Sequence, residues 1–232
     1  MEETKFFKNV WRFNGLIISA AGVLAIVVLF FAGYHVIKDV FRKRQVRNIV
    51  NIAENDNVKE EWTLGYMRQL DGTEYVMVPL QSDQSYAQSY YSKSSYSVRN
   101  FLFINVKTNG KEWLFPNNNW LIANNYTLSE KEHREKDRKI RAILYNIVKS
   151  DTNDDGRLTE KDKLTIALSS PSGKNYREIL AAIDLFIGHS LMGSDTMLIL
   201  YQKNNIGYSA NVSLKDFTLS NQSELPKIKG DS

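Results

Sequence analysis

The sequence contains no cysteine, only four prolines and only three histidines in 232 residues. The lack of cysteine excludes disulfide bonds, thiolate catalysis and zinc or iron–sulfur sites built on cysteine. His35, His133 and His189 are far apart and form no His-x-x-x-His pair, so their spacing predicts no histidine metal site. The length leaves room for one ordinary domain rather than two.

The chain also lacks an excess of charge outside its first fifth. The net charge is +4, but residues 1–50 hold eight Lys and Arg against three Asp and Glu, and the rest of the chain holds 22 against 23. A nearly neutral domain offers no broad basic surface to a phosphate backbone, so we expect no nucleic-acid partner. Basic residues at the edges of an apolar segment, as in residues 1–50, are typical of a segment that contacts anionic lipid headgroups.

One long apolar run, residues 15–37, has the length of a transmembrane helix. Its 23 residues, among which Ser19 is the one clearly polar side chain before Gly33, cover roughly 34 Å, enough for a hydrocarbon core of about 30 Å. A cleaved signal peptide is the alternative, but its apolar region is shorter and ends in small residues. The run therefore predicts an uncleaved single-pass anchor. Gly15, Ser19 and Gly22 share one stripe, which would permit close packing of a partner helix.

The orientation of the anchor is left open by two opposing signals. The C-terminal flank carries slightly more Lys and Arg than the N-terminal flank, which favours a cytoplasmic domain. The calcium-binding motif described below favours an extracytoplasmic domain, because weak calcium sites are useful where the ion is abundant. We expect the extracytoplasmic arrangement and keep the cytoplasmic one as the alternative.

The rest of the pattern predicts an α+β chain, with one N-terminal transmembrane helix followed by a mainly antiparallel β domain that has one or two helices. Five segments are expected: an N-terminal flank (1–14), the transmembrane helix (15–37), a basic juxtamembrane segment and connector (38–61), the α+β domain (62–226) and a tail (227–232).

Three β pairs are predicted from alternating apolar residues around turn-forming dipeptides. The turns are Asp71-Gly72, Asn109-Gly110 and Asn204-Asn205. Residues 164–168 also alternate as a strand does and end at a Ser-Pro-Ser-Gly turn. Between the first two pairs, residues 82–97 are rich in serine and tyrosine, which predicts an exposed loop. Tyrosines supply contact area with few rotatable bonds, so this loop is also a candidate partner-binding surface.

Two helices are expected inside the domain. Residues 129–132 match a capping box, and apolar residues from Ile140 to Val148 recur at helical spacing, which favours a helix through about Lys149, with a strand at 140–148 as the alternative. Residues 179–187 also show helical spacing, and Gly188 to Gly193 is interpreted as a loop.

One motif carries chemistry, and it lies in residues 151–162. Calcium needs six to eight converging oxygens, and the loop offers side chains at positions 1, 3, 5 and 12, a backbone carbonyl at position 7 and a direct or water-mediated ligand at position 9. Glycine at position 6 permits the sharp turn. The predicted ligands are Asp151, Asn153, Asp155, Arg157 (through its carbonyl), Thr159 and Asp162.

These twelve residues resemble the calcium loops of the EF-hand and dockerin families, which implies a Ca²⁺ cofactor. Asp162 departs from the EF-hand pattern, where a glutamate binds with both oxygens, and the shorter side chain implies weaker selectivity over Mg²⁺. An ordinary acidic turn is the alternative, since Asp, Asn and Gly are also turn residues. A lone site more often stabilises a fold than switches it, so we expect a structural ion.

The whole chain resembles bacterial membrane-anchored proteins without an assigned activity, which implies a bacterial inner membrane. The hairpins at residues 101–115 and 196–214 also resemble blades of TolB-like periplasmic propellers, although the chain is too short to close a ring.

We therefore predict a membrane-anchored, calcium-binding accessory protein that binds a membrane or envelope protein through its helix and residues 82–97. The first alternative is a calcium-responsive regulator of a membrane complex. A membrane-bound hydrolase with a dispersed carboxylate site is a third hypothesis, although no motif nominates its residues.

Overall fold

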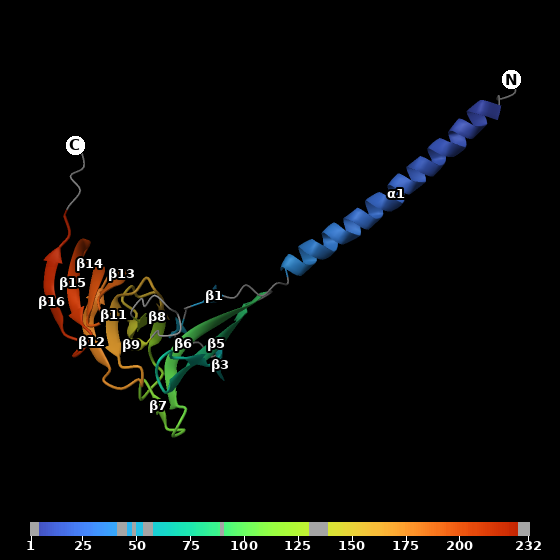
Figure 1. Ribbon diagram of the computed structural model, residues 1–232. Helices are drawn as coiled ribbons and strands as arrows, with labels where there is room; N and C mark the ends of the chain where they lie inside the picture. The colour runs from blue at the N-terminus through green and yellow to red at the C-terminus, as the bar shows by residue number, and fades with distance from the viewer. Residues whose placement is uncertain are drawn as a thin grey trace, which may run out of the picture. The chain divides into compact units, whose positions relative to one another are not determined.

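The computed structural model describes residues 5–40, 46–47, 50–52, 58–88, 91–129 and 139–226, and the chain divides into two compact units, Met1–Arg44 and Gln45–Ser232. The first unit contains the helix α1 (Lys5–Val40; Figure 1). Within α1, Asn9–Tyr34 has a mean hydropathy of 2.7 and is exposed throughout its apolar length. A helix of this length and composition either spans a membrane or is a signal sequence.

The second unit is built from β-strands. In chain order they are β1 (Val46–Arg47), β2 (Val50–Asn51), β3 (Val58–Leu64), β4 (Arg68–Gln69), β5 (Tyr75–Gln88), β6 (Tyr91–Asn105), β7 (Lys111–Trp113), β8 (Leu121–Ser129), β9 (Ile140–Val148), β10 (Arg157–Leu158), β11 (Leu164–Ser169), β12 (Arg177–Ile183), β13 (Leu185–Met192), β14 (Thr196–Lys203), β15 (Ile206–Ser213) and β16 (Leu219–Glu224).

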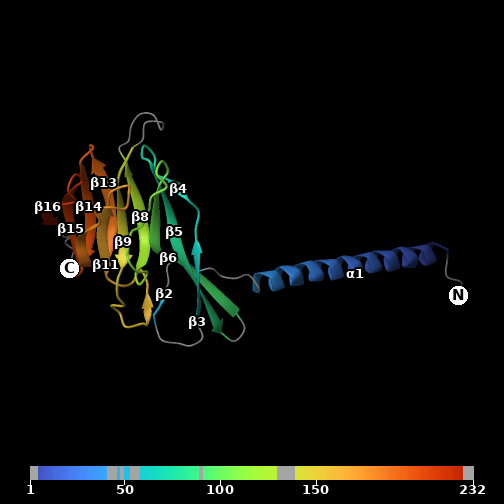
Figure 2. The same cartoon turned by 90° about the horizontal axis from the view of Figure 1, so that it is seen from below.

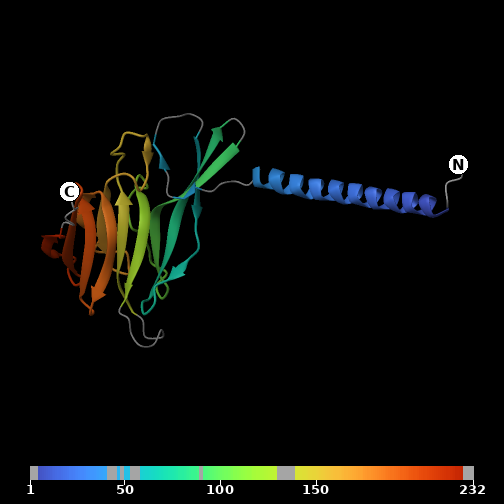
Figure 3. The ribbon, with the colours of Figure 1, turned by 90° about the horizontal axis from the view of Figure 1, so that it is seen from above.

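These strands form three large sheets and one small ladder. The first sheet has the order β1-β6-β5-β3, with β4 beside β5 and β7 beside β6. The central sheet has the order β12-β11-β9-β8, and the last sheet has the order β13-β14-β15-β16. β10 pairs with β2 in a separate two-stranded ladder. Every pairing is antiparallel except that of β1 with β6. Figures 2 and 3 show the three sheets side by side.

The central sheet is covered on both faces by apolar side chains. One hydrophobic cluster lies between the central and the last sheets and includes Leu144, Ile166, Met197 and Ile199. The other lies between the first and the central sheets and includes Phe103, Ile143 and Tyr145. The domain is thus a three-layer β structure in which each neighbouring pair of sheets shares a core.

β9 shows why its sequence was difficult to interpret. Ala142, Leu144 and Val148 point into one cluster, while Ile143, Tyr145 and Ile147 point into the other. A strand buried on both faces loses the alternation of apolar and polar residues that marks a half-exposed strand. The helix expected at 140–149 is therefore wrong, and the alternative, a strand at 140–148, is correct. Residues 130–138, which hold most of the predicted capping box and helix start, lie outside the described residues.

The second helix expected in the domain is also wrong. Residues 179–187 belong to β12 and β13, which meet at a sharp turn around Asp184, and Ala182 has a positive φ of 54°. The turn places apolar residues of two strands at intervals that mimic a helix. The expected loop from Gly188 to Gly193 is mostly β13, so that prediction is wrong as well.

Residues 82–97 do not form the predicted exposed loop. β5 continues to Gln88 and β6 begins at Tyr91, and the two strands pair across this segment, from Ser82 opposite Ser97 to Gln88 opposite Tyr91. Ser82 and Ser97 are buried. Low-complexity composition suggested a loop, but a long backbone ladder does not require apolar side chains.

The predicted connector is likewise partly strand. Within 38–61, the described residues include β1, β2 and the start of β3. The basic residues at 42–44, the polar run at 54–57 and the tail at 227–232 lie outside the described residues.

The α+β class, with one N-terminal apolar helix and a mainly antiparallel β domain, is confirmed. The three predicted β turns are also present. Gly72, Asn109, Asn204 and Asn205 all have positive φ, which is the backbone conformation that these residue types tolerate. The strand at 164–168 corresponds to β11.

Candidate metal centre

The predicted calcium loop connects β9 to β11 in the middle of the central sheet. Val148 and Leu164 are register partners, so both ends of the loop are held close together by the ladder. Residues 151–162 therefore form a long excursion from one of the most buried parts of the domain.

The first half of the loop is wrapped around the Asp151 carboxylate. Asp151 Oδ1 accepts hydrogen bonds from the backbone N–H groups of Asn153 (3.2 Å) and Asp155 (3.3 Å), and its Oδ2 accepts one from Gly156 (2.7 Å). Asn153 Oδ1 accepts a bond from the backbone N–H of Asp155 at 3.0 Å. Short Asp and Asn side chains stabilise turns in this way, and here they bring positions 1, 3 and 5 onto one side of the chain.

Two residues with positive φ make this wrap sterically feasible. Gly156 has φ of 74° and Asp154 has φ of 59°. Glycine adopts this region without cost, and aspartate is among the residues that tolerate it. The glycine that the sequence pattern places at position 6 is therefore used as a sharp turn.

Backbone donors also affect the charge of Asp151. Partial burial opposes ionisation of this carboxyl, but the backbone hydrogen bonds from Gly156, Asn153 and Asp155 outweigh it and hold the pKa of Asp151 below its usual value. The carboxylate is therefore ionised at neutral pH, as a calcium ligand must be.

Asp162, at position 12, is placed differently. Its side chain is only 1% exposed. Its Oδ1 accepts bonds from the backbone N–H (2.7 Å) and the hydroxyl (3.1 Å) of Thr152, and its Oδ2 accepts a bond from the backbone N–H of Thr159 (2.9 Å). Asp162 thus closes the loop by joining positions 2 and 9. The described residues contain no group of three His, Cys, Asp or Glu side chains that could hold a metal ion.

Positions 7 and 8 form β10, which pairs with the segment that follows the apolar helix in sequence. Arg157 lies opposite Asn51, Leu158 lies opposite Val50, and the backbone N–H of Ile52 donates to the Gly156 carbonyl at 3.0 Å. Leu158 and Val50 are both buried, at 2% and 1% exposure. The predicted calcium loop thus has a strand partner from a distant part of the chain.

The Arg157 carbonyl points away from β2. Its backbone N–H donates to Asp155 Oδ1 at 3.0 Å, and in an extended strand the N–H and C=O of one residue point to the same side. The carbonyl is therefore on the side of Asp155, where position 7 of a calcium loop supplies its oxygen. The Thr159 hydroxyl, at position 9, is near Asp162 Oδ2 at 3.4 Å.

The first half of the loop therefore gathers more of the predicted ligands than the second half. The side chains of Asp151, Asn153 and Asp155 and the carbonyl of Arg157 share one side of the turn, whereas Asp162 is held by Thr152 and Thr159. The metal site stays a prediction. The pairing with residues 50–52 was missed because strand pairing over a hundred residues leaves no local signal, although the mainly apolar stretch at residues 49–53 was one available clue.

Comparisons with known proteins show no family for this chain. No family model matches it, and no curated protein matches it. Among solved structures, it is similar to the beta-propeller domain of the Trilobed protease from Pyrococcus furiosus, with 12% identity and a TM-score of 0.35 over 72% of this chain and 43% of that chain. The chain thus spans less than half the length of that domain. A match at this TM-score carries no inference about the fold or the function of this chain.

Proposed function

We propose that this chain is a membrane-anchored interaction protein, in which α1 holds the β domain at a bilayer surface where it binds a protein partner. The observation that carries this proposal is the apolar surface of α1. Large apolar side chains are exposed around the helix, including Leu16, Leu24, Val28 and Phe30 at 58–78% exposure. A helix that is apolar all round and has no protein cover is stable in lipid and costly in water.

Extraction of the full chain from membranes tests the anchor. We expect the wild-type chain to remain in the membrane fraction after alkaline carbonate treatment. Replacing both Leu24 and Val28 with arginine should release it, because each charge at the centre of a span costs roughly 2.5–3.5 kcal/mol. The matched control places the same two charges at Asn9 and Phe13, at the end of the span, and should stay bound. A mature chain that begins after residue 40 would show a cleaved signal sequence instead.

We further propose that the loop binds Ca²⁺, with Mg²⁺ as a weaker competitor, and that the ion stabilises the domain. Asp151, Asn153, Asp155 and the Arg157 carbonyl would be its ligands, while Thr159 and Asp162 would contribute directly or through water. The wrapped first half of the loop supports this proposal. A low-affinity site of this kind is useful where calcium is abundant, which supports an extracytoplasmic domain.

Calorimetric titration of CaCl₂ into the full chain in detergent micelles tests the ion. We expect binding heat and a rise in the unfolding temperature at millimolar calcium, since a ligand that binds only the folded state stabilises it. Asp151→Asn should abolish both effects. Asp154→Asn is the matched control, because it makes the same chemical change at position 4, which supplies no ligand, and asparagine tolerates the positive φ there. Absence of heat and stabilisation in the wild type would refute calcium binding.

A second candidate function, a calcium-responsive regulator, is favoured by one observation. The β2–β10 ladder joins the loop to residues 50–52, which follow the apolar helix in sequence, so a change in the loop has a direct route to this segment. Hydrogen exchange separates the two functions. Calcium-dependent protection confined to residues 151–162 indicates a structural ion, whereas protection of the Ile52 amide as well, which donates to the Gly156 carbonyl, indicates a regulator.

A further inference from the structure

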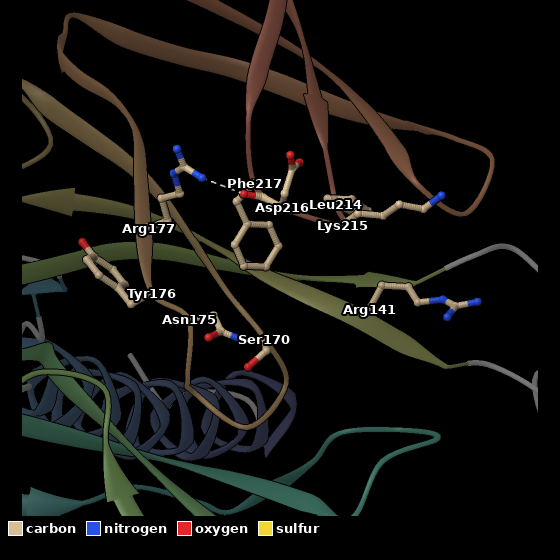
Figure 4. A pocket seen from close by; sticks show the side chains of 9 residues that line it. All are labelled: Arg141, Ser170, Asn175, Tyr176, Arg177, Leu214, Lys215, Asp216 and Phe217. Carbon is tan, nitrogen blue, oxygen red and sulfur yellow. Dashed lines mark hydrogen bonds between the residues drawn. The ribbon is translucent and has the colours of Figure 1, made fainter.

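A cavity of about 550 Å³ lies between the ends of the central and the last sheets (Figure 4). Its walls come from three separate parts of the chain: the beginning of β9, the connection from β11 to β12, and the connection from β15 to β16. Cavities of this size are in the range that binds small molecules or single peptide side chains with their neighbours.

The charges of the cavity walls have one predominant sign. Arg141, Arg177 and Lys215 line it, against a single carboxylate, Asp216. Asp195, which pairs with Lys215, reduces the local excess to one positive charge, whereas residues 51–232 as a whole carry a net charge of −1. A cleft lined by charges of one sign attracts ligands of the opposite sign.

The Asp216 carboxylate is bound by hydroxyl groups of its own turn. Hydrogen bonds from the Ser213 and Thr218 hydroxyls hold its pKa below the usual value, and the bond from Thr218 Oγ1 is 2.8 Å long. Arg177 Nη1 donates to the main-chain carbonyl of Asp216 at 2.9 Å. This bond fixes the arginine, and a guanidinium has four further N–H donors with which to bind a ligand.

Lys215 forms an ion pair with Asp195 at 2.9 Å, and both side chains are largely exposed. An exposed ion pair of this kind contributes little stability, roughly 0–1 kcal/mol. A ligand carboxylate can therefore replace Asp195 at small cost.

The floor of the cavity is apolar and is held in a fixed conformation. Phe217 is 8% exposed and has a positive φ of 55°, which is unusual for an aromatic residue and strains the backbone. The turn that holds it is closed by a backbone bond from Ser213 N–H to the Thr218 carbonyl at 2.9 Å, and a bond from Leu214 N–H to the Asp195 carbonyl ties it to the β13–β14 connection. Strained positions persist where the surrounding contacts determine them, and they are common at binding sites.

The arrangement of the cations around Phe217 suggests the shape of the ligand. In Figure 4 Arg177 lies on one side of the Phe217 ring, and Arg141 and Lys215 lie on the other. A phosphate ion needs donors that converge on one point, whereas these donors are divided by an apolar ring. An extended peptide with acidic residues on either side of an apolar residue matches both the charges and the floor.

We propose that this cavity binds an acidic peptide segment of the partner protein, with carboxylates at Arg177 and at Arg141 and Lys215, and an apolar side chain over Phe217. The inference rests on the proposed function as an interaction protein and specifies the chemistry of the partner.

Fluorescence anisotropy with a labelled peptide tests the proposal on the full chain in detergent micelles. The probe carries two glutamates on each side of a leucine, and the control probe carries glutamines in their place. We expect the acidic probe to bind and the glutamine probe not to bind. Lys215→Gln and Arg177→Gln should each raise the Kd about tenfold, because each removes a charge-assisted contact. Lys107→Gln is the matched control, since Lys107 is an equally exposed partner in a surface ion pair, with Glu74, and it should leave the Kd unchanged.

A variant with higher affinity is needed as a control, because loss of binding in the other variants could also result from misfolding. Asp216→Asn removes one negative charge from the cavity wall and can keep the hydrogen bonds from Ser213 and Thr218, so the acidic probe should bind severalfold more tightly. Equal affinity of the acidic and glutamine probes, or no binding of the acidic probe at 1 mM, would overturn the proposal. Displacement of the probe by inorganic phosphate at an equal concentration would also overturn it, in favour of a small-anion site. The peptide-binding results do not depend on whether the chain stays in the membrane fraction after carbonate treatment. The proposal of a peptide site and the proposal of a membrane anchor can therefore fail separately.

Discussion

The central and the last sheets have the same topology, four antiparallel strands paired in chain order, but they differ in how many faces are covered. In the central sheet every residue of β11 and eight of the nine residues of β9 are buried. In the last sheet β14 alternates between buried and half-buried residues. The comparison teaches that position in the stack of sheets determines both the sequence pattern of a strand and how well it tolerates substitution.

Leucine truncation should show the largest difference between the two sheets. Leu144 in β9 is fully buried, whereas Leu198 in β14 is only partly buried and lies between Met197 and Ile199, which face the core. We expect Leu144→Ala to lower the free energy of unfolding by roughly 2–5 kcal/mol and Leu198→Ala by about 1 kcal/mol or less. Denaturant unfolding measures both. Equal costs would show that an unseen partner covers the outer face of the last sheet.

The glycines of two turns provide a second comparison. Gly173 lies between β11 and β12 and Gly193 between β13 and β14, and both have positive φ, of 79° and 70°. A Cβ at Gly173 would be 2.3 Å from the Phe103 ring in the first sheet, whereas a Cβ at Gly193 would meet nothing within 4 Å. Gly193→Ala should therefore cost only the backbone strain, about 1–2 kcal/mol, and Gly173→Ala about 2 kcal/mol more. Thermal unfolding of the two variants measures the difference, and a result in the opposite order would contradict the packing of the central sheet on the first.

Two buried tyrosines allow a smaller test. The Tyr145 hydroxyl in β9 lies 2.8 Å from Ser169 Oγ, whereas the buried Tyr201 hydroxyl in β14 has no hydrogen-bond partner among the described residues. Tyr145→Phe should cost about 1 kcal/mol, because a hydrogen bond is lost, and Tyr201→Phe should be neutral or stabilising, because an unpaired buried hydroxyl is removed. Equilibrium unfolding in urea checks both values. A comparable loss at Tyr201 would show that its hydroxyl is in fact satisfied.

The smallest effect concerns the contact between the two sheets at His189. This side chain of β13 packs against Tyr126 of β8, with ring centroids 5.1 Å apart, and burial lowers the pKa of His189. A histidine with a lowered pKa stabilises the fold fully above about pH 6.5, its unfolded value, and this contribution declines as the pH falls towards the folded value. His189→Phe should therefore reduce the loss of thermal stability between pH 7.5 and 5.5. An unchanged dependence of thermal stability on pH would show that groups other than His189 cause the loss.

The sequence predicts the parts of the fold that depend on local chemistry. The turns at Asp71-Gly72, Asn109-Gly110 and Asn204-Asn205 require residues that accept positive φ, and these residues are visible in the sequence. β9 could not be assigned in the same way, because its continuous apolar character results from two neighbouring sheets that the sequence does not place. The loop predicted at residues 82–97 was wrong for the opposite reason, since the pairing of these residues depends on backbone hydrogen bonds and not on composition.

The candidate sites show the same limit. The loop at 151–162 was recognisable because its predicted ligands are contiguous and their spacing is fixed by the motif. The displacement of Asp162 towards Thr152 and Thr159 could not be predicted, because it depends on hydrogen bonds within the folded loop. The cavity around Phe217 was missed altogether, since its cations Arg141, Arg177 and Lys215 lie at the start of β9, at the start of β12 and between β15 and β16, and only the packing of two sheets brings these parts together.

The β2–β10 ladder also has a mechanical consequence. Tension transmitted along the backbone from α1 reaches the two-residue ladders of β1 and β2 before it reaches the long strands β5 and β6. A ladder of two residue pairs separates under a smaller force than the extended β5–β6 hairpin. Release of β1 from β6 and of Val50 from its buried position beside Leu158 would therefore lengthen the segment after α1 while the long strands remain paired.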